Sequence, residues 1–487
     1  MIATLALLAL AGCRASNGLA SSPMLPFTGS QRDSLSVTQL ASKGKIKHIV
    51  IIIQENRSFN NLFYGYPRAK TVKSGLDSRN HTIVLKPISL KTTWDLQHNG
   101  QGFIASCHGT GSIPGTDCRM NGFNKELCKA IVYGTHCPKK HEFLAYAYVP
   151  HSETAPYFSM AHQYVLADRM YASDFDVSSF ISHQYIIAGV NPDSSVDYPI
   201  NSGDWGCTGG VTDKIAILGK DRKWPVGLEQ PCWNLTTIGD ELDAAKPMLH
   251  WAFYAVKVGA LKPRDACGQR HHLGPDANSS RAPGIWSAYQ AIEHICHGPD
   301  WDEDVKPFSP PSTFLTDIKS GELRAVTWIT PRDKDSDHGG SDSASGPSWV
   351  ASLVNAIGQS KFWDSSAIFI FWDDPGGWYD PEAPKYLMHS DYDSLGYRIP
   401  LLIISPYAKK GYVSHTPYEH GTILKFVEDT FGLRRLNLPY GSDVRANPAD
   451  DAFDFSKPPR KFVPIKAPLD ENYFLSEPDD MQPPDTD

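Results

Sequence analysis

An unbroken run of β-branched residues, Ile49–Ile53, constrains the fold of this chain more than any other sequence feature. Such a run predicts a strand buried on both faces, which is typical of parallel sheets covered by helices. Similar short apolar runs recur at Met248–Val256, Leu323–Ile329, Ala367–Trp372 and Pro400–Ser405. Together, the runs predict a central sheet whose strands are mostly parallel.

Two amphipathic segments accompany these runs. Residues Ser348–Ile357 place their large apolar side chains on one helical face, and Gly358 follows as a stop signal. Residues Gly421–Phe431 repeat the pattern and precede Gly432. Strands that alternate with helices predict an α/β fold in which helices sandwich the sheet.

The N-terminus predicts export. Residues 1–12 are apolar but too short to span a bilayer, as in a signal peptide. They lead into Cys13 through Leu-Ala-Gly, which resembles a bacterial lipobox, so we expect residues 13–44 to be a lipidated tether. The alternative is a plain secretory leader with an incidental cysteine. Either way, we expect an outer-membrane lipoprotein, or a periplasmic or secreted protein.

The cysteines predict disulfide-stapled insertions. Eight remain after Cys13, at positions 107, 118, 128, 137, 207, 232, 267 and 296. An even set in an exported chain predicts four disulfides, although the sequence does not choose the pairing. A zinc site is the rival interpretation, which the lack of any CxxC pair disfavours. The cysteines fall within two segments that interrupt the strand and helix pattern, at about 94–150 and 198–300, which we interpret as insertions near the strand ends.

Acidic and amide residues follow two of the predicted strands. Glu55 and Asn56 come just after the first, and Asp373 and Asp374 end another. Their oxygen atoms suit a divalent cation such as Ca²⁺, Mg²⁺ or Mn²⁺, and a cation would neutralise the adjacent carboxylates. The alternatives are a helix N-cap in the first case and a solvated Asp-Asp-Pro-Gly turn in the second. Because two independent strand ends share this chemistry, we favour one metal site.

A pair of serines, Ser178 and Ser179, precedes an apolar, helix-like run. A serine hydroxyl becomes a nucleophile next to a general base or a metal ion, and the carboxylates fit the second case. Serines in such loops are otherwise usually caps. The acidic stretch Asp333–Asp342 could hold a further cation, but a solvated loop is the preferred interpretation.

The charge and aromatic content add limits. A formal charge of −8, from 46 basic and 54 acidic residues, argues against a nucleic-acid partner. Several tryptophans near the insertions could form a cage for a choline headgroup, although packing in the core is the preferred interpretation. They are Trp205, Trp233, Trp251, Trp286 and Trp301.

Four motifs together resemble a bacterial phosphoesterase family that contains phosphocholine-type phospholipases C and respiratory-burst-inhibiting acid phosphatases. They are Glu55-Asn56-Arg57-Ser58-Phe59, the segment Asp168 to His183, Ser336-Asp337-His338, and Asp373-Asp374-x-Gly376-Gly377. The match covers most of residues 45–435. It implies an alkaline-phosphatase-like fold, with a catalytic domain at 45–435. The Pro- and Asp-rich composition from about residue 433 predicts a C-terminal extension at 436–487 that is partly disordered.

The resemblance also implies roles for individual residues. Metal ligands would be Glu55, Asn56, Asp373 and Asp374, together with the nucleophilic hydroxyl of Ser179, for which Ser178 is the alternative. His98 and His338 would be catalytic residues of the phosphate pocket. This chain departs from the family pattern at Ser182-His183, where relatives have Asn-His, and at Asp380-Pro381, where relatives often have Asp-His.

The expected function is an exported, metal-dependent phosphoric ester hydrolase, of phospholipase C or acid phosphatase type. Its substrate would be a phosphate ester or phospholipid headgroup, with the membrane reached through the lipid anchor. The alternative is a non-catalytic surface lipoprotein that keeps the fold as a binding module.

Overall fold

A computed structural model of the 487-residue chain describes 44–132, 134–175, 178–190, 206–208, 214–217, 221–222, 227–255, 267, 287–306, 312–385, 387, 394–436 and 441–478. These residues belong to one unit, Ser36–Asp487. The expected leader, Cys13 and all of the tether except Gly44 lie outside them, as do Trp205, Trp286 and residues 479–487. Within the described residues, no helix combines the length and apolarity that crossing a membrane requires.

A nine-stranded sheet forms the centre of the fold. Its order is β12 (Val305–Lys306), β11 (Trp251–Tyr254), β13 (Val326–Ile329), β1 (His48–Gln54), β14 (Ser366–Trp372), β15 (Arg398–Ile404), β8 (Val165–Tyr171) and β16 (Tyr412–Ser414), and β17 (Tyr418–Glu419) also pairs with β8. Only β15 runs antiparallel to its neighbours. The mostly parallel sheet and its five predicted strands are confirmed.

The sequence pattern missed β8. Asp168 and Arg169 interrupt its apolar residues, so the segment does not resemble a buried strand. In the structure, the buried Asp168 carboxylate accepts hydrogen bonds from the Lys70 N–H and from His415 Nδ1, each at 2.9 Å. The Asp168 carbonyl also accepts one from Arg398 Nη1 at 2.7 Å.

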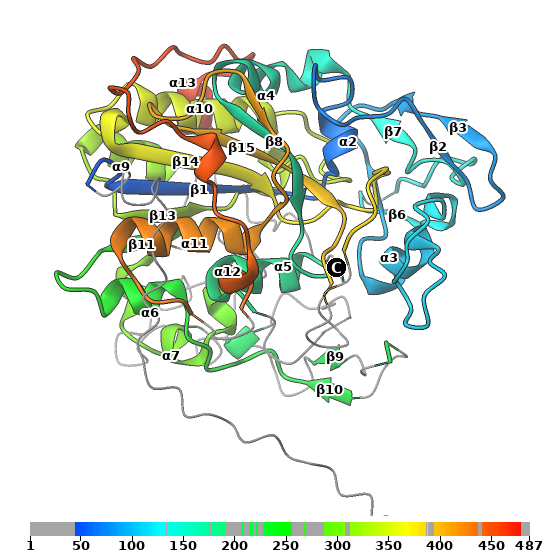
Figure 1. The fold of residues 1–487 in the computed structure, drawn as a ribbon, viewed down its shortest axis with the longest axis horizontal. Coiled ribbons are helices and arrows are strands. Elements are labelled where there is room, and N and C mark those ends of the chain that lie inside the picture. Colours follow the sequence, from blue (N-terminus) through cyan, green and yellow to red (C-terminus); the bar gives the residue numbers. More distant parts are fainter. Residues whose placement is uncertain are drawn as a thin grey trace, which may run out of the picture. The chain divides into compact units, whose positions relative to one another are not determined.

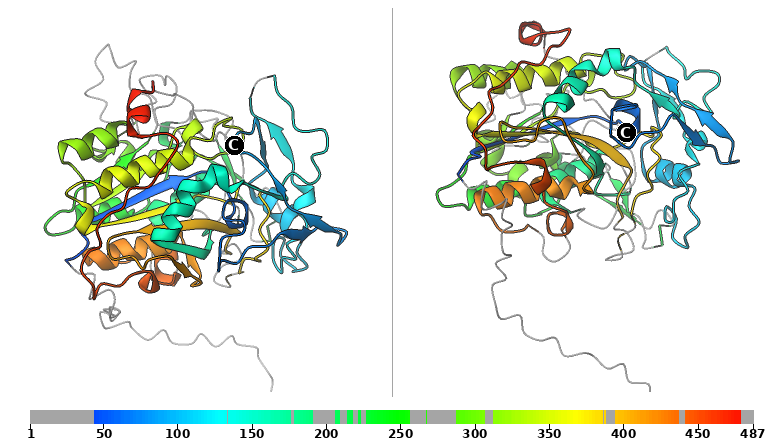
Figure 2. Two further views of the ribbon diagram at one scale, coloured as in Figure 1. Left: turned by 90° about the horizontal axis from the view of Figure 1, so that it is seen from above. Right: turned by 45° about the horizontal axis from the view of Figure 1, so that its top comes forward.

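Helices cover both faces of the sheet (Figures 1 and 2). On one side lie α4 (His151–Gln163), α10 (Gly346–Gly358), α9 (Ser312–Ser320) and α13 (Glu471–Ser476), and on the other lie α5 (Ser179–Ala188), α11 (His420–Phe431), α12 (Ser442–Arg445) and α6 (Ile238–Asp243). Both predicted helices are present, as α10 and α11. After α11, Gly432 adopts a left-handed conformation with φ of 72° and closes the helix.

A separate lobe of residues 74–148 stands beyond the carboxyl ends of β1 and β14 (Figure 1). It contains β2 (Ser74–Leu76), β3 (Thr82–Val84), β4 (Lys86–Pro87), β5 (Trp94–Leu96), α3 (Gly100–Cys107), β6 (Cys128–Ala130) and β7 (Ala147–Tyr148). The short helix α2 (Phe59–Leu62) precedes it. The lobe has its own apolar cluster, in which Phe103 stacks on Tyr397 with ring centroids 4.6 Å apart.

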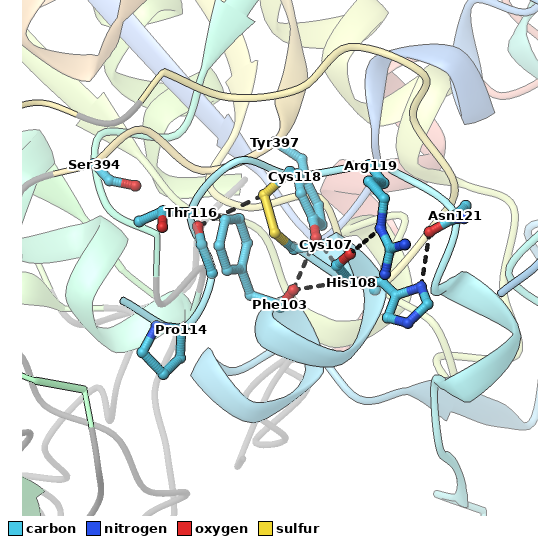
Figure 3. The surroundings of a disulfide bond; sticks show 12 residues. Phe103, Cys107, His108, Pro114, Thr116, Cys118, Arg119, Asn121, Ser394 and Tyr397 are labelled. Atoms are coloured by element: carbon cyan, nitrogen blue, oxygen red, sulfur yellow. Dashed lines mark hydrogen bonds between the residues drawn. A yellow bond between two sulfur atoms is a disulfide. The ribbon is translucent and has the colours of Figure 1, made fainter. Parts of the chain in front are cut away.

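All eight cysteines form disulfides. The disulfide prediction is therefore confirmed, and the alternative of a zinc site is wrong. The pairs are Cys107–Cys118, Cys128–Cys137, Cys207–Cys232 and Cys267–Cys296. Figure 3 shows the first of these, beside which Arg119 Nε donates to the His108 carbonyl at 2.7 Å. The last two lie in the second insertion, whose described elements include β9 (Ile215–Ile217), β10 (Gly227–Glu229), α7 (Glu293–Cys296) and α8 (Asp300–Glu303).

Part of the described chain after residue 435 packs against the main core. Phe453, Phe455, Ile465 and Phe474 are buried in the same core as the central strands. The described residues 441–478 therefore form part of the α/β unit.

Candidate active site

The carboxyl ends of β1 and β14 bring the two predicted acidic motifs together. The strands pair in register, with Gln54 opposite Trp372, so Glu55 and Asp373 leave the sheet side by side. The Asp373 N–H donates to the Gln54 carbonyl at 3.0 Å, and the Asn56 N–H donates to Asp373 Oδ1 at 3.3 Å. All four residues, Glu55, Asn56, Asp373 and Asp374, are fully buried.

Backbone conformation keeps these side chains close. Asn56 has a φ of 54°, a left-handed conformation that asparagine tolerates better than most residues. Gly376 packs against it: a Cβ there would lie 2.1 Å from the Asn56 carbonyl oxygen. The Gly376 N–H also donates to Asp374 Oδ1 at 2.7 Å. The glycine after the two aspartates is therefore needed for close approach, which a solvated turn would not require.

Ser179 joins this group from α5, of which it is the first residue. Its Oγ donates to Asp374 Oδ2 at 2.9 Å and lies 3.4 Å from Asn56 Nδ2. Ser178 is the N-cap residue of the same helix and is only partly buried. The geometry therefore favours Ser179 over Ser178 as the hydroxyl of the site.

His183 lies in the same cluster and was not recognised as a site residue from the sequence. Its Nε2 is 3.5 Å from Glu55 Oε1 and 3.7 Å from Asp373 Oδ2. Residues four apart on a helix lie on one face, so the Ser179 and His183 spacing was a usable signal.

Two further histidines approach from outside the sheet. His98 Nδ1 is 2.7 Å from the Leu96 carbonyl, and His338 Nδ1 contacts the Gly339 carbonyl. A carbonyl only accepts hydrogen bonds, so both rings carry a proton on Nδ1 and direct Nε2 elsewhere. Their centroids are 5.6 Å apart. The buried Asp95 lies beside both, with Oδ2 3.3 Å from His98 Nδ1 and 3.8 Å from His338 Nε2.

The Asn56 amide connects the carboxylates with the histidines. In one orientation Nδ2 faces His98 Nε2 at 2.8 Å. In the other, Nδ2 donates to Glu55 Oε2 at 2.6 Å and to Asp373 Oδ1 at 3.0 Å, while Oδ1 accepts from His98 Nε2 at 2.8 Å and from His338 Nε2 at 3.1 Å. The first orientation turns Oδ1 toward the Glu55 and Asp373 carboxylates, whereas the second satisfies both the amide oxygen and the amide nitrogen.

The acidic stretch 333–342 corrects a sequence expectation. We expected a solvated loop, but Asp335, Ser336, Asp337 and His338 are all buried. The loop is held from within: Arg57 Nε donates to the Asp337 carbonyl at 2.7 Å, and the Tyr157 hydroxyl donates to Asp337 Oδ2 at 2.7 Å. Burial raises the pKa of Asp337 to about 7. These contacts fix the wall that carries His338.

Asp380, which precedes Pro381, is buried and has structural contacts. It forms a two-point ion pair with the buried Arg398, at 2.8 and 3.0 Å. It also accepts a hydrogen bond from the Asn60 N–H at 3.2 Å. The Asp380 carboxylate therefore connects α2 with β15.

The donor set fits a divalent cation. Three buried carboxylates, an amide and a hydroxyl offer hard oxygen ligands within one cluster, and Glu55, His183 and Asp373 lie close enough to share an ion. Burying like charges together is costly unless they are compensated, and a cation would remove that cost.

The described tryptophans pack inside the protein, as expected. Trp251 and Trp301 belong to the main core. Trp233 lies 5.6 Å from the ring of Phe180, which follows Ser179. The described tryptophans therefore give no support to a choline cage.

Comparisons with known proteins match most of the chain to phosphoesterases. Residues 46–434 match a family model described as the phosphoesterase family. The chain is 22% identical to a non-hemolytic phospholipase C from Burkholderia pseudomallei, over 88% of this chain and 62% of that protein. It is 23% identical to a non-specific phospholipase C1 from Arabidopsis thaliana, over 92% of this chain and 78% of that protein. The chain thus spans less than two thirds of the first of these relatives.

A solved structure of a protein in the alkaline phosphatase superfamily, from Vibrio parahaemolyticus, is also similar. Its TM-score is 0.35 at 10% sequence identity, and the match covers 84% of this chain and 72% of that one.

Proposed function

Because this chain belongs to the phosphoesterase family, we propose that it is a phosphoric ester hydrolase whose nucleophile is Ser179. The observation that carries the proposal is the Ser179 hydroxyl, which is hydrogen-bonded at 2.9 Å to a buried pair of aspartates at a strand end. In this proposal the ligands of one divalent cation, Ca²⁺, Mg²⁺ or Mn²⁺, are Glu55, Asn56, Ser179, Asp373 and Asp374. His183 is a further ligand candidate.

Ser179 begins the reaction. Its Oγ attacks phosphorus, the new Oγ–P bond forms, and the P–O bond to the leaving alcohol breaks. The hydroxyl proton has an acceptor in Asp374 Oδ2, with which it already shares a hydrogen bond. A bound cation would polarise the phosphoryl oxygens and lower the pKa of the hydroxyl.

The histidines complete the reaction. His98 and His338 direct Nε2 toward Asn56, so a protonated ring can donate to the phosphoryl oxygens or protonate the leaving oxygen. Water then hydrolyses the phosphoseryl group, which releases the phosphate monoester and restores the serine. Asp95 is a positioning residue that holds both rings.

A phosphodiester headgroup is the proposed substrate. The support is that the relatives are named as phospholipases C. A phosphatase acting on monoesters uses the same chemistry, so the assay must compare the two ester types.

Export and anchoring are part of the proposal. Four disulfides support an oxidising compartment, because such bonds persist outside the cytosol. Lipidation at Cys13 is tested by metabolic labelling with a fatty acid, which should label the wild type and not Cys13→Ser.

The test of the function uses p-nitrophenylphosphorylcholine and p-nitrophenyl phosphate. We expect turnover of the diester, its loss after chelation with EDTA, and recovery with an added divalent cation. Ser179→Ala should abolish turnover, whereas the matched variant Ser178→Ala should keep it. Equal activity in the two variants would refute the nucleophile assignment. No turnover by the wild type with any of the three cations would favour the binding-module alternative.

A further inference from the structure

The second disulfide of the lobe closes an exposed loop of unusual composition. Residues 127–132 and 139–143 are almost entirely exposed, and they include the apolar side chains of Leu127, Ile131, Val132 and Phe143. Leu127 is 62% exposed and Val132 is 37% exposed. Single exposed apolar residues are common, but four within one short loop are not, so this group needs an explanation. We call the described residues 127–132 and 134–143 the apolar loop.

The apolar loop is also basic. Lys129, Lys139 and Lys140 are exposed on it, and Glu142 pairs with Arg79 at 2.6 Å. Glu126, directly before the loop, is buried, and burial raises its pKa well above the usual range. Asp342 is exposed, and its N–H donates to the Thr92 carbonyl at 2.9 Å. A positively charged apolar surface on a chain of net charge −8 is complementary to an anionic lipid surface.

The first part of the loop, residues 127–132, is hydrogen-bonded to segments that carry the candidate active site. β6 pairs with β5, which carries Asp95, and the Gln97 N–H donates to the Leu127 carbonyl at 2.9 Å directly before His98. The N–H groups of Ile131 and Val132 both donate to the Thr93 carbonyl, at 3.1 and 3.3 Å. Ile131 also packs against Gly340, whose Cβ, if present, would lie 2.6 Å from the isoleucine side chain. The loop thus borders both histidine-bearing segments.

We propose that the apolar loop is a membrane-docking surface, which inserts Leu127 and Val132 into the interface of an anionic phospholipid bilayer while its lysines bind the headgroups. This inference rests on the proposed function and deepens it, because it assigns the substrate to a lipid surface. The catalytic side chains are buried, with His98 only 5% exposed. A phosphate group held in a bilayer therefore reaches them more readily when the protein surface beside the site contacts that bilayer.

The test compares two double variants with their parent. The parent and both variants are the whole chain with Cys13→Ser, so that no acyl chain contributes to binding. One is Leu127→Ser with Val132→Ser; Ile131 is kept because it supports Gly340. The matched control is Leu228→Ser with Val463→Ser, the same residue types at 62% and 57% exposure outside the lobe. Circular dichroism and thermal melting check that both fold. Binding is measured by co-sedimentation with vesicles of phosphatidylcholine and phosphatidylglycerol, and with phosphatidylcholine alone.

We expect the loop variant to lose about tenfold in partitioning onto the anionic vesicles, and the control to stay within about twofold of the parent. Replacement of Lys129, Lys139 and Lys140 by glutamine should lower partitioning by more than about tenfold on anionic vesicles only. Partitioning of the loop variant within twofold of the parent, or equal losses in the control, would overturn the proposal.

Hydrolysis separates this inference from the proposed function. With a short-chain phosphatidylcholine below its critical micelle concentration, the loop variant should match the parent, whereas on vesicles its rate should fall about tenfold. A parent that binds vesicles but hydrolyses neither substrate refutes the function and leaves the docking result standing. A loop variant equally active on both substrates refutes the docking surface alone.

Discussion

The two sides of the candidate site are built in different ways. The sheet side consists of Glu55, Asn56, Asp373 and Asp374, which follow two long, paired strands of the main core. The lobe side contributes Asp95 and His98 from the three-residue strand β5 and the turn after it, in a segment with its own small core and two disulfides. The sheet side is fixed by regular secondary structure, and the lobe side by cross-links and turn contacts. We therefore expect changes on the sheet side to affect the chemistry, and changes on the lobe side to affect local order as well as the chemistry.

The largest effect should come from the sheet side. Asp373→Asn removes one of three buried carboxylates and should lower kcat/KM by at least about a thousandfold, because the proposed cation loses a charged ligand. The same change relieves like-charge repulsion, so without added metal the variant should melt at or above the temperature of the wild type.

Asp364→Asn, at an exposed position just before β14, is the control. It should change neither kcat/KM nor the melting temperature of the metal-free protein. A fall in melting temperature of the metal-free Asp373→Asn protein would indicate that this carboxylate is structural.

On the lobe side, His98→Ala should lower kcat by about a hundredfold, within the range for loss of a general acid, and should change the pH profile of kcat. Asp95→Asn should lower kcat less than His98→Ala does. It should still change the pH profile of kcat, because Asp95 lies 3.3 Å from the His98 ring. His81→Ala, a mostly exposed histidine of the same lobe, is the control. Unaltered pH profiles in both site variants would remove His98 from the proton transfer.

A third prediction separates local order from chemistry. Cys128→Ser with Cys137→Ser opens a loop with a sequence separation of 9 residues. It should cost about 2–3 kcal/mol of local stability. In hydrogen exchange, the amides of β5, β6 and Gln97 should lose protection while those of β1 and β14 keep theirs. Activity should fall about tenfold as His98 loses its fixed position. Uniform loss of protection across both regions would show that lobe and sheet unfold as one unit.

The same division explains what could be predicted from the sequence. The ends of β1 and β14 were identifiable because apolar runs long enough to be buried strands are followed at once by oxygen ligands. Asp95 was missed because β5 has only three residues and owes its position to pairing with β6. The loop with His338 was misjudged as solvated because its acidic composition hides the buried contacts of Arg57 and Tyr157. Such contacts join residues far apart in the chain, so local pattern does not reveal them.

The smallest effect concerns a buried carboxylate outside the site. Glu428 on α11 is fully buried and accepts a hydrogen bond from Arg435 at 2.6 Å. Burial and the nearby Asp443 raise its pKa from 4.5 to about 9. A carboxyl group with a raised pKa in the folded state contributes stability that is present below pH 4.5 and is lost as pH rises toward 9.

Glu428→Gln keeps an acceptor for Arg435 and removes this titration. Its free energy of unfolding, measured by urea denaturation from pH 5 to 9, should rise relative to the wild type as pH increases, by about 1–3 kcal/mol at the upper end. Glu322→Gln, at an exposed position, should show no such trend, and neither variant should alter kcat. If the gain of Glu428→Gln did not vary with pH, titration of Glu428 could not be its cause. A rising gain would show that the charge of a buried carboxylate weakens this fold at a position where no cation is proposed.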